Sequence, residues 1–347
     1  MTDQRISIVI PCRNESGPLR RLLDELLRQD TPIHEVIVVD NASTDGTGAV
    51  LEQYKRDHPD YPLKALRCDR IGQPAALNAG IRAAAGDIIV RMDAHSRPEP
   101  DYVRRSVDIL RDTGAAVVGG VWEIVPGRPT SVAQAIARAV SHPMGAGDAA
   151  YRTGRTFPGQ VAVDTVPFGC FLQKTWADLG GFNERILTNE DYEFNYRVRQ
   201  SGRTVLLDPH IRSTYYARST LGALAFQYFR YGWWKAQMLK SHPRSLRWRQ
   251  AVPAVFVATV AVLTLASVFS VASQIMLGGL LLIYFAALTA ASSRISGGRR
   301  SWRIFPVLPA VFATIHFCWG GGVLVNLLTV GRLPRRFGIL AAGRSDS

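Results

Sequence analysis

The chain has 347 residues, of which 47% are hydrophobic and 20% are charged, and its formal net charge is +13 at pH 7. This length suits two ordinary domains, or one domain followed by a membrane portion. The positive charge does not indicate nucleic-acid binding, because the arginines beyond residue 243 flank long apolar runs and no helix-turn-helix, zinc-finger or RNA-binding signature is present. Basic residues in this position fit cytoplasmic loops and anionic lipid headgroups instead.

The cysteines and the N-terminus indicate the compartment. Cys12, Cys68, Cys170 and Cys318 are scattered, with no C-x-x-C pair and no metal-finger spacing, so they read as reduced cytosolic thiols. The first three residues lead directly into a strand pattern, and no charged-then-apolar leader precedes it. We therefore expect the N-terminal domain to lie in the cytoplasm.

Strand and helix patterns alternate over the first ninety residues. The strands expected here are 6–10, 35–40, 65–67 and 87–92. The helices expected between them cover 19–27, a segment from the polar loop 41–47 to about residue 57, and 75–85. Pro11 is expected to end the first strand, because proline cannot continue a central ladder. The alternation predicts an α/β fold with a doubly wound, mostly parallel sheet.

The sheet is organised around the strand that runs into Asp93-Ala94-His95. In an open α/β sheet, ligands bind at the carboxyl ends of the strands. If the strand geometry persists, Asp93 and His95 point the same way and suit a divalent cation such as Mg²⁺ or Mn²⁺. Taken alone, the pair is more often a turn cap beside a solvated imidazole. The first strand is not followed by G-x-G-x-x-G or G-x-x-x-x-G-K, so dinucleotide and P-loop sites lose their main support.

Further strands are expected at 117–121 and 161–164, with a helix and a mobile loop between residues 126 and 157. Asp40, at the end of the second strand, is either a site residue or a residue with a helix-capping or turn role. Glu190 and Asp191 begin a helix, where acidic residues are often simple partners of the helix dipole. Each of these carboxylates indicates a functional site only when it is considered together with the other motifs of the chain.

The last third of the chain is apolar. Residues 220–238 mix aromatic rings with cations, which is typical of a helix at a membrane interface. The runs 251–272 and 274–291 are long enough to cross a bilayer or nearly so. The run 304–330 is also apolar, but we expect it to be broken by Pro306, Pro309 and the glycines 320–322. Two spans would return the basic loop near residue 299 to the cytoplasm, whereas a third full span would place the basic tail outside. We expect three membrane segments, and the topology of the last one stays open.

Four features stand in order along the chain: Asp40 with the loop 43–47, Asp93-Ala94-His95, Glu190-Asp191, and the run 227–231. As an ordered set they resemble glycosyltransferase family 2, which carries the GT-A nucleotide-diphospho-sugar transferase fold. The resemblance covers residues 6–238. The segments 93–98, 163–169 and 227–235 further resemble the ExoA-type glycosyltransferases of succinoglycan biosynthesis, which extend a lipid-linked sugar.

The resemblance implies a site for the nucleotide-sugar donor. Asp40 would hydrogen-bond the uracil or ribose of a UDP-sugar, in a base pocket lined by Pro11, Arg13 and Glu15. Arg230 would clamp the diphosphate. It stands where related membrane synthases carry Q-x-x-R-W, although Tyr231 takes the last place here.

The resemblance also implies a metal, Mn²⁺ or Mg²⁺, that bridges the two phosphates of the donor. Asp93 would anchor this metal and contact the nucleotide-sugar. His95 stands where the family usually has a second aspartate, and whether it touches the metal is left open. Imidazole suits Mn²⁺ better than Mg²⁺.

The catalytic roles implied by the resemblance fall to two carboxylates. Asp191 would be the general base that removes the proton of the acceptor hydroxyl, with no unusual pKa required. Glu190 would orient the site or bind acceptor hydroxyls. Attack opposite the leaving diphosphate would invert the anomeric centre. Acceptor contacts are expected from Gly169, Gln227 and Trp234.

The sequence therefore predicts a multi-pass protein of the inner (plasma) membrane with a cytoplasmic catalytic domain. It would transfer a sugar, by analogy glucose, from a UDP-sugar to a polyprenyl-diphosphate-linked saccharide in exopolysaccharide biosynthesis, with room for polysaccharide assembly partners. Two alternatives stay open, a polyprenyl-phosphate sugar synthase and a catalytically inactive membrane scaffold. The expected domains are a GT-A domain (1–219), an interfacial helix with a basic linker (220–250), a membrane domain (251–330) and a basic tail (331–347).

Overall fold

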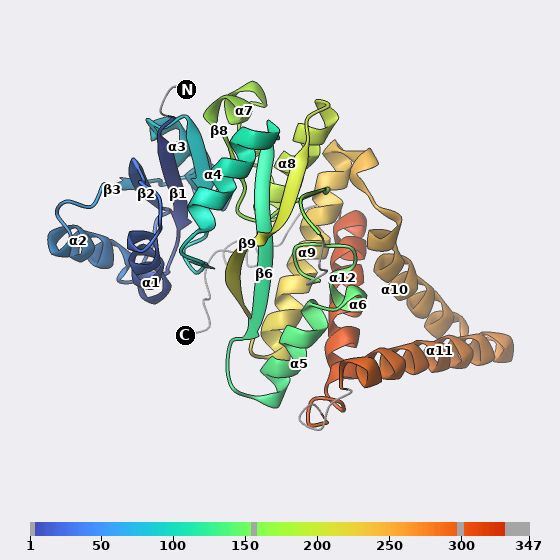
Figure 1. The fold of residues 1–347 in the computed structure, drawn as a ribbon. Helices are drawn as coiled ribbons and strands as arrows, with labels where there is room; N and C mark the ends of the chain where they lie inside the picture. Colours follow the sequence, from blue (N-terminus) through green and yellow to red (C-terminus); the bar gives the residue numbers. More distant parts are fainter. Residues whose placement is uncertain (1–3, 154–157, 297–301, 330–347) are drawn as a thin grey trace. The chain divides into compact units, whose positions relative to one another are not determined.

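A computed structural model describes residues 4–153, 158–296 and 302–329 of the chain (Figure 1). The chain divides into two compact units. Of the described residues, the first unit contains 4–123 and 158–215, and the second contains 124–153, 216–296 and 302–329. Residues 124–153 thus pack with the C-terminal part of the chain. The functional domain boundaries expected at residues 219, 250 and 330 stay a prediction.

The first unit is built on a mixed sheet. Its strands are β1 (Ile6–Cys12), β2 (Glu35–Asp40), β3 (Leu63–Arg67), β4 (Ile88–Arg91), β5 (Arg97–Pro98), β6 (Val117–Pro126), β7 (Val161–Ala162), β8 (Cys170–Leu172) and β9 (Val205–Ala217). The sheet order is β3-β2-β1-β4-β8-β6-β9-β5, with β7 paired to β9. β1 to β4 pair in parallel, as expected from the strand and helix alternation. β8 runs antiparallel to both β4 and β6, and β9 runs antiparallel to both β5 and β7.

The first strand does not end at Pro11. β1 continues to Cys12, and Pro11 aligns with Val39 of β2. The Val9 carbonyl accepts a hydrogen bond from Met92, on the β4 side. Residue 11 faces the same side as residue 9, beyond the last residue of β4 that pairs with β1. A proline is tolerated there because its missing N–H has no ladder partner to lose.

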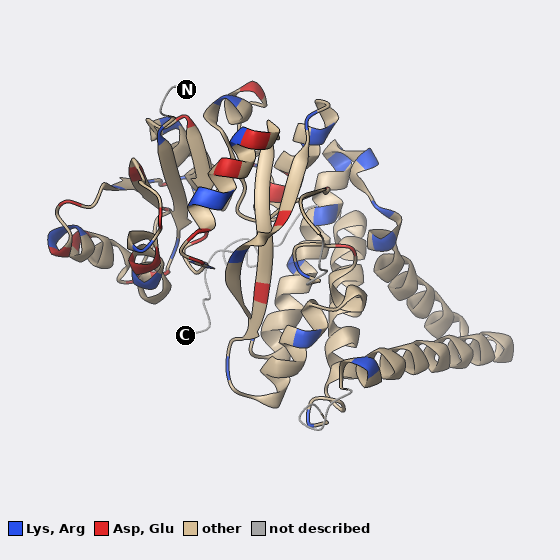
Figure 2. Cartoon of the chain, in the orientation of Figure 1, with Lys and Arg blue, Asp and Glu red and all other residues tan. Residues whose placement is uncertain are grey.

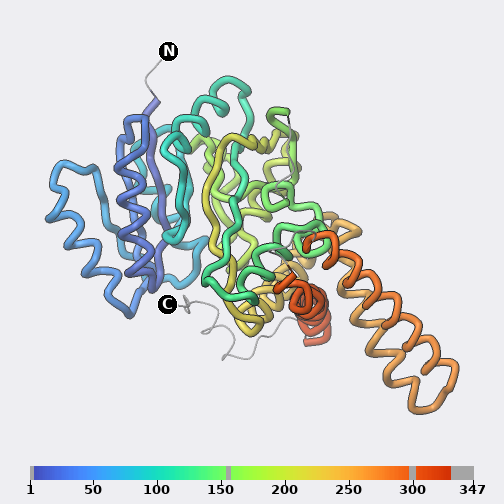
Figure 3. The backbone as a smooth tube through the Cα atoms, turned by 60° about the horizontal axis from the view of Figure 1, so that its bottom comes forward, coloured from blue at the N-terminus to red at the C-terminus, as the bar shows by residue number. Residues whose placement is uncertain are grey.

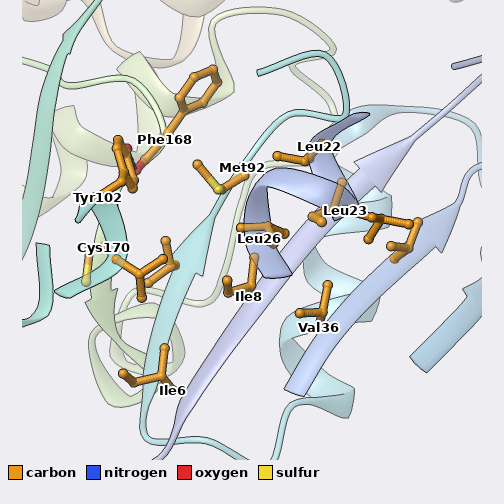
Figure 4. Packing of buried hydrophobic residues seen from close by; sticks show 14 of the residues in the cluster. Ile6, Ile8, Leu22, Leu23, Leu26, Val36, Met92, Tyr102, Phe168 and Cys170 are labelled. Atoms are coloured by element: carbon orange, nitrogen blue, oxygen red, sulfur yellow. Dashed lines mark hydrogen bonds between the residues drawn. The ribbon is translucent and has the colours of Figure 1, made fainter. Parts of the chain in front are cut away.

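The helices of the first unit cover the sheet. They are α1 (Ser16–Leu27), α2 (Thr47–Asp57), α3 (Gln73–Ala83), α4 (Tyr102–Thr113), α7 (Gln173–Asp178) and α8 (Glu190–Gln200). In Figure 4, Leu22, Leu23 and Leu26 of α1 lie over Ile8 and Val36 of the neighbouring strands. All five side chains are buried, as the i, i+3, i+4 spacing of the leucines predicts. This packing fixes the carboxyl ends of β1, β2 and β4, where the expected site residues stand.

The second unit is mainly helical. It contains α5 (Ser131–Val140), α6 (Pro143–Ala146), α9 (Leu221–Ser241), α10 (Trp248–Ala266), α11 (Val271–Ile295) and α12 (Leu308–Leu328). α10, α11 and α12 are each long and apolar enough to cross a membrane. Figure 2 shows few charged residues on them except near their ends.

The third apolar run is not broken as expected. α12 is continuous from Leu308 to Leu328, and Pro309 lies in its first turn, where a missing N–H removes no helical hydrogen bond. The glycines 320–322 lie inside the helix. Two of them are packing positions, since a Cβ on Gly322 would lie 2.2 Å from the Phe229 carbonyl oxygen and one on Gly320 would lie 2.4 Å from that of Pro253.

Candidate functional site

A buried arginine at the end of β4 gathers the expected catalytic carboxylates. The side chain of Arg91 is 2% exposed. Its Nη2 lies 2.9 Å from Oδ1 of Asp93 and 2.9 Å from Oε1 of Glu190, and its Nη1 lies 2.8 Å from Oδ2 of Asp191. Both terminal nitrogens of the planar guanidinium are therefore engaged. Nη2 contacts the carboxylate after β4 and one carboxylate at the start of α8, and Nη1 contacts the other carboxylate at the start of α8.

The segment before β8 completes this cluster. Phe168 has a left-handed backbone, with φ of 50°, and its backbone hydrogen-bonds the Asp191 carboxylate. The ring of Phe168 lies 5.4 Å from the guanidinium carbon of Arg91. The Gly169 carbonyl accepts a hydrogen bond of 3.1 Å from the Arg91 N–H. A Cβ at Gly169 would lie 2.8 Å from Cγ1 of Val117, so this glycine is required by packing as well as being an expected acceptor contact.

Burial raises the pKa of Asp191 to about 7, and the neighbouring Glu190 and Asp93 carboxylates add to this shift against the opposing effect of Arg91. Burial opposes the charged form of Arg91, but the three carboxylates outweigh it and raise the pKa of the guanidinium. With every group ionised, three carboxylates face one guanidinium, which leaves two negative charges. The expectation of an ordinary pKa for Asp191 therefore needs correction for the protein without bound substrate.

Asp93 and His95 do not continue the strand. β4 ends at Arg91, and Asp93 begins a turn in which the Ser96 N–H donates to the Asp93 carbonyl over 3.0 Å. His95 therefore lies on the turn, half exposed, with Nδ1 3.3 Å from Oε1 of Glu15. The alternation expected between residues 93 and 95 is absent because the chain turns immediately after Met92.

A divalent cation fits this end of the sheet. Asp93 contacts Arg91 and the amide of Gln73 (2.7 Å) through Oδ1, so Oδ2 is the oxygen available to a metal. The two excess negative charges match one divalent ion. Within the described ranges, no group of three or more His, Cys, Asp or Glu side chains is arranged to hold a metal by itself. A metal here would take its remaining ligands from a bound diphosphate and water, as Mg²⁺ commonly does.

The expected nucleotide residues gather at the ends of β1 and β2. Pro11 is buried in β1, and Nε and Nη1 of Arg13 are buried without a hydrogen bond to the described residues. Asp40 ends β2, and its Oδ1 accepts a 3.0 Å hydrogen bond from the Ser43 N–H. Asp40 therefore has the expected turn role in the loop before α2, whereas it does not cap that helix, whose N-cap is Gly46. Glu15 precedes α1, and its N–H donates to Thr47 over 3.0 Å.

The three expected site residues on α9 belong to the second unit. Arg230 packs its guanidinium 5.9 Å from the ring of Phe226. Gln227 is partly buried, and Trp234 is buried at 8% exposure. Contact of these side chains with donor or acceptor stays a prediction.

The sequence reasoning missed Arg91, Gln73 and Phe168. Arg91 carried a readable signal, because it is the one charged residue in a strand of apolar positions and directly precedes the Met92-Asp93 pair. The contacts of Gln73 and Phe168 depend on how α3 and the segment before β8 return to β4. No local sequence pattern predicts these tertiary contacts.

The sequence comparisons agree with the geometry. Residues 7–172 match the family model described as Glycosyl transferase family 2. The succinoglycan biosynthesis protein ExoA of Rhizobium meliloti (strain 1021) is 29% identical over 341 residues, which cover 96% of this chain and 98% of that protein. A dolichyl N-acetyl-alpha-D-glucosaminyl phosphate 3-beta-D-2,3-diacetamido-2,3-dideoxy-beta-D-glucuronosyltransferase of Methanococcus voltae is 27% identical over 70% of this chain and 76% of that protein.

The fold comparison points the same way. The mannosyltransferase PcManGT from Pyrobaculum calidifontis, solved in complex with GDP-Man and Mn²⁺, superimposes with a TM-score of 0.64 over 95% of this chain and 88% of that chain. The sequence identity is 20%, so this likeness concerns the fold alone. The expected GT-A fold followed by apolar helices is confirmed.

Proposed function

We propose that the chain, whose residues 7–172 match the glycosyltransferase family 2 model, is a membrane-anchored enzyme that extends a polyprenyl-diphosphate-linked saccharide in exopolysaccharide biosynthesis. The observation that carries the proposal is the Arg91 cluster. It sets the carboxylate of Asp191 beside that of Asp93 at the end of the sheet where ligands bind in α/β folds. The match to the succinoglycan biosynthesis protein ExoA over nearly the full length of both proteins supports a role in exopolysaccharide assembly, and glucose is the sugar that we would test first.

In this proposal the donor is a UDP-sugar held at the ends of β1 and β2. Asp40 hydrogen-bonds the base or ribose in a pocket lined by Pro11 and Glu15. The buried Nε and Nη1 of Arg13 supply donors for the nucleotide, since a bound ligand would satisfy atoms that otherwise cost free energy.

Asp93 would hold a divalent cation through Oδ2, with His95 beside it and a half-exposed ring that can approach a bound diphosphate. When bound there, Mn²⁺ or Mg²⁺ would neutralise charge on the leaving diphosphate without a proton transfer. PcManGT was solved with Mn²⁺, which supports Mn²⁺ as the ion to test first.

Asp191 then acts as the general base. Its carboxylate takes the proton of the acceptor hydroxyl while the hydroxyl oxygen bonds to the anomeric carbon and the carbon–oxygen bond to the diphosphate breaks. Attack from the side opposite the diphosphate inverts the anomeric centre. Arg91 holds Asp191 by Nη1 and keeps Glu190 close on Nη2, where Glu190 orients the site or accepts hydrogen bonds from acceptor hydroxyls.

The acceptor is assigned to Gly169, Gln227 and Trp234, and the donor diphosphate to Arg230. A lipid-linked acceptor lies at the bilayer surface, which suits a catalytic domain joined to apolar helices. We place the protein in the inner membrane with the catalytic domain on the cytoplasmic side, where it can meet other proteins of polysaccharide assembly.

The test uses membranes that contain the full chain, incubated with radiolabelled UDP-glucose, Mn²⁺ and a lipid extract. We expect label in an organic-soluble, alkali-stable glycolipid with the wild type, and a loss of about 10²- to 10⁴-fold with Asp191→Asn, the range for a general base. UDP-N-acetylglucosamine and GDP-mannose serve as alternative donors. Label that forms equally with Asp191→Asn would contradict the base role and favour an acceptor that needs no base, such as a polyprenyl phosphate.

A further inference from the structure

Of the three apolar helices, α10 and α11 have surfaces suited to lipid. Among the described residues of α10, Ala254 alone is buried, and in α11 only Leu288, Ala291 and Ser292 are buried. Large apolar side chains stand out along both helices and at the turn between them. These include Val262 (63% exposed), Phe269 (90%) and Ile283 (71%). So much exposed apolar surface would be unfavourable in water, so we expect these side chains to contact lipid.

α12 is equally apolar but is packed as a core helix. Buried positions recur along one face: Leu308, Val311, Phe312, Ile315, Gly320, Gly322, Val323 and Asn326. Its principal neighbour is α9, which runs beside it in Figure 1. A Cβ at Gly232 of α9 would lie 2.1 Å from the Trp319 carbonyl oxygen, so the two backbones touch.

The helix that covers α12 is not suited to hydrocarbon. α9 carries Gln227, Arg230, Lys235 and Lys240. Lys235 is 2% exposed, and its Nζ donates to the Ser245 carbonyl over 2.8 Å. If α12 crossed the bilayer, the cations of α9 would be carried to membrane depth with it. Charged groups at that depth are costly.

A second contact comes from the short helix α6. His316 lies near the middle of α12. Its Nε2 lies 2.9 Å from the Met144 carbonyl oxygen of α6, and its Nδ1 lies 3.0 Å from the Tyr284 hydroxyl of α11. Met144 belongs to a four-residue helix between loops. A spanning α12 would place this irregular backbone at the centre of the bilayer, where unsatisfied peptide groups are disfavoured.

The directions of the helices also differ. In Figure 1, α12 runs along α9 whereas α11 runs across the foot of α12. In Figure 3, the α10–α11 hairpin extends away from α12, which is viewed nearly along its axis. Helices that cross in this way do not all lie along one membrane normal.

We propose that the chain crosses the membrane only as the α10–α11 hairpin, and that α12 lies at the bilayer surface, packed on α9 and α6. The proposal rests on the membrane anchoring assigned above and names the part of the chain that the bilayer receives. It also satisfies the distribution of charge. Arg294 at the end of α11 and Arg303 before α12 then share one side with the catalytic domain, as the positive-inside rule requires, and the sequence after α12 is also basic.

The test fuses alkaline phosphatase or a fluorescent protein to each terminus of the full chain in a Gram-negative host. The phosphatase is active only outside the cytoplasm, and the fluorescent protein folds only inside it. We expect both termini to fluoresce and neither to show phosphatase activity. In a third variant, Phe269→Cys at the hairpin turn is labelled in intact cells by a membrane-impermeant maleimide, with the unsubstituted chain and its four native cysteines as the blank.

Phosphatase activity at the C-terminus alone would show an odd number of crossings and overturn the proposal. Failure to label Phe269→Cys above the blank would overturn the crossing of the hairpin. A chain recovered in the soluble fraction after lysis would instead contradict the membrane anchor of the proposed function, so the two failures are distinguishable.

Discussion

Arg91 and Arg104 each face three carboxylates, but they do so in opposite surroundings. Arg91 is 2% exposed and contacts Asp93, Glu190 and Asp191 at 2.8–2.9 Å. Arg104, on the outer face of α4, is 42% exposed and lies 2.9 Å from Asp30, 3.9 Å from Asp101 and 3.7 Å from Asp108. Solvent screens the charges around Arg104. The buried charges around Arg91 are not screened, so each of them is stabilised mainly by its ion-pair partners. Burial, and not the number of ion pairs, distinguishes the cluster around Arg91 from the solvated ion pairs of Arg104.

The largest effect should come from Arg91→Gln. This change leaves three carboxylates crowded in a buried position without their cation, and breaking a buried ion pair in this way costs about 3–5 kcal/mol. We expect a lower melting temperature in detergent and transfer at background level. A variant that melts with the wild type would show that the cluster is not the buried network described here.

Removal of the cation is the next test of the cluster. EDTA should abolish transfer by the wild type, and added Mn²⁺ should restore it. In Asp93→Asn, the affinity for Mn²⁺ measured with UDP present should fall by more than the roughly 10- to 100-fold caused by loss of a group that supports a metal ligand. Full turnover in excess EDTA would remove the metal role of Asp93.

The pH profile tests the charge balance. A base works only when deprotonated, so activity falls as the pH drops through its pKa. Because burial raises the pKa of Asp191 to about 7, the acid limb of kcat/KM should lie well above the ordinary aspartate value of about 3.9. A bound cation favours the carboxylate, so the limb should move to lower pH as Mn²⁺ is raised. A limb near pH 4 at low Mn²⁺ would contradict the burial argument.

The smallest effect should come from Arg104→Gln. Its three partners are themselves 28–50% exposed and remain hydrated after the change. We expect an unchanged melting temperature and unchanged transfer, which makes this variant the matched control for Arg91→Gln. A loss comparable with that of Arg91→Gln would show that burial does not govern the difference.

The parallel half of the sheet could be predicted because each strand is followed by its own amphipathic helix. The spacing of the leucines in α1 and the apolar run of β2 are enough to predict that these side chains are buried. The antiparallel strands could not be ordered in the same way. β8 is only three residues long, and its place between β4 and β6 is set by pairings with distant segments.

The candidate site was predicted unevenly for a similar reason. Asp93, Glu190 and Asp191 were recognised by their order along the chain, and the structure brings them together on one guanidinium. Arg91 was missed because two of its three partners, Glu190 and Asp191, lie about a hundred residues further along the chain. His95 was expected to point the same way as Asp93. That alignment required the strand to continue to residue 95, but β4 ends at Arg91.

The membrane region shows the limits of composition. Hydropathy selects α10, α11 and α12 alike, since all three are long and apolar. The glycines of α12 suggested a break, whereas Gly320 and Gly322 admit neighbouring backbones closely. Which face of an apolar helix meets protein and which meets lipid is a property of tertiary packing.

The most direct test of the account is a double-mutant cycle between Arg91→Lys and Asp191→Asn, read as the rate of transfer to the glycolipid. A lysine cannot hold two carboxylates in the fixed fork of a guanidinium, and a displaced base can cost about 10²-fold. If Arg91 acts by holding Asp191, Arg91→Lys should slow the wild type by about that factor and add little to Asp191→Asn. Arg197→Lys alters a different carboxylate-paired arginine, which lies on α8, and should leave the rate unchanged in both backgrounds. Losses from Arg91→Lys and Asp191→Asn that simply multiply would contradict the account.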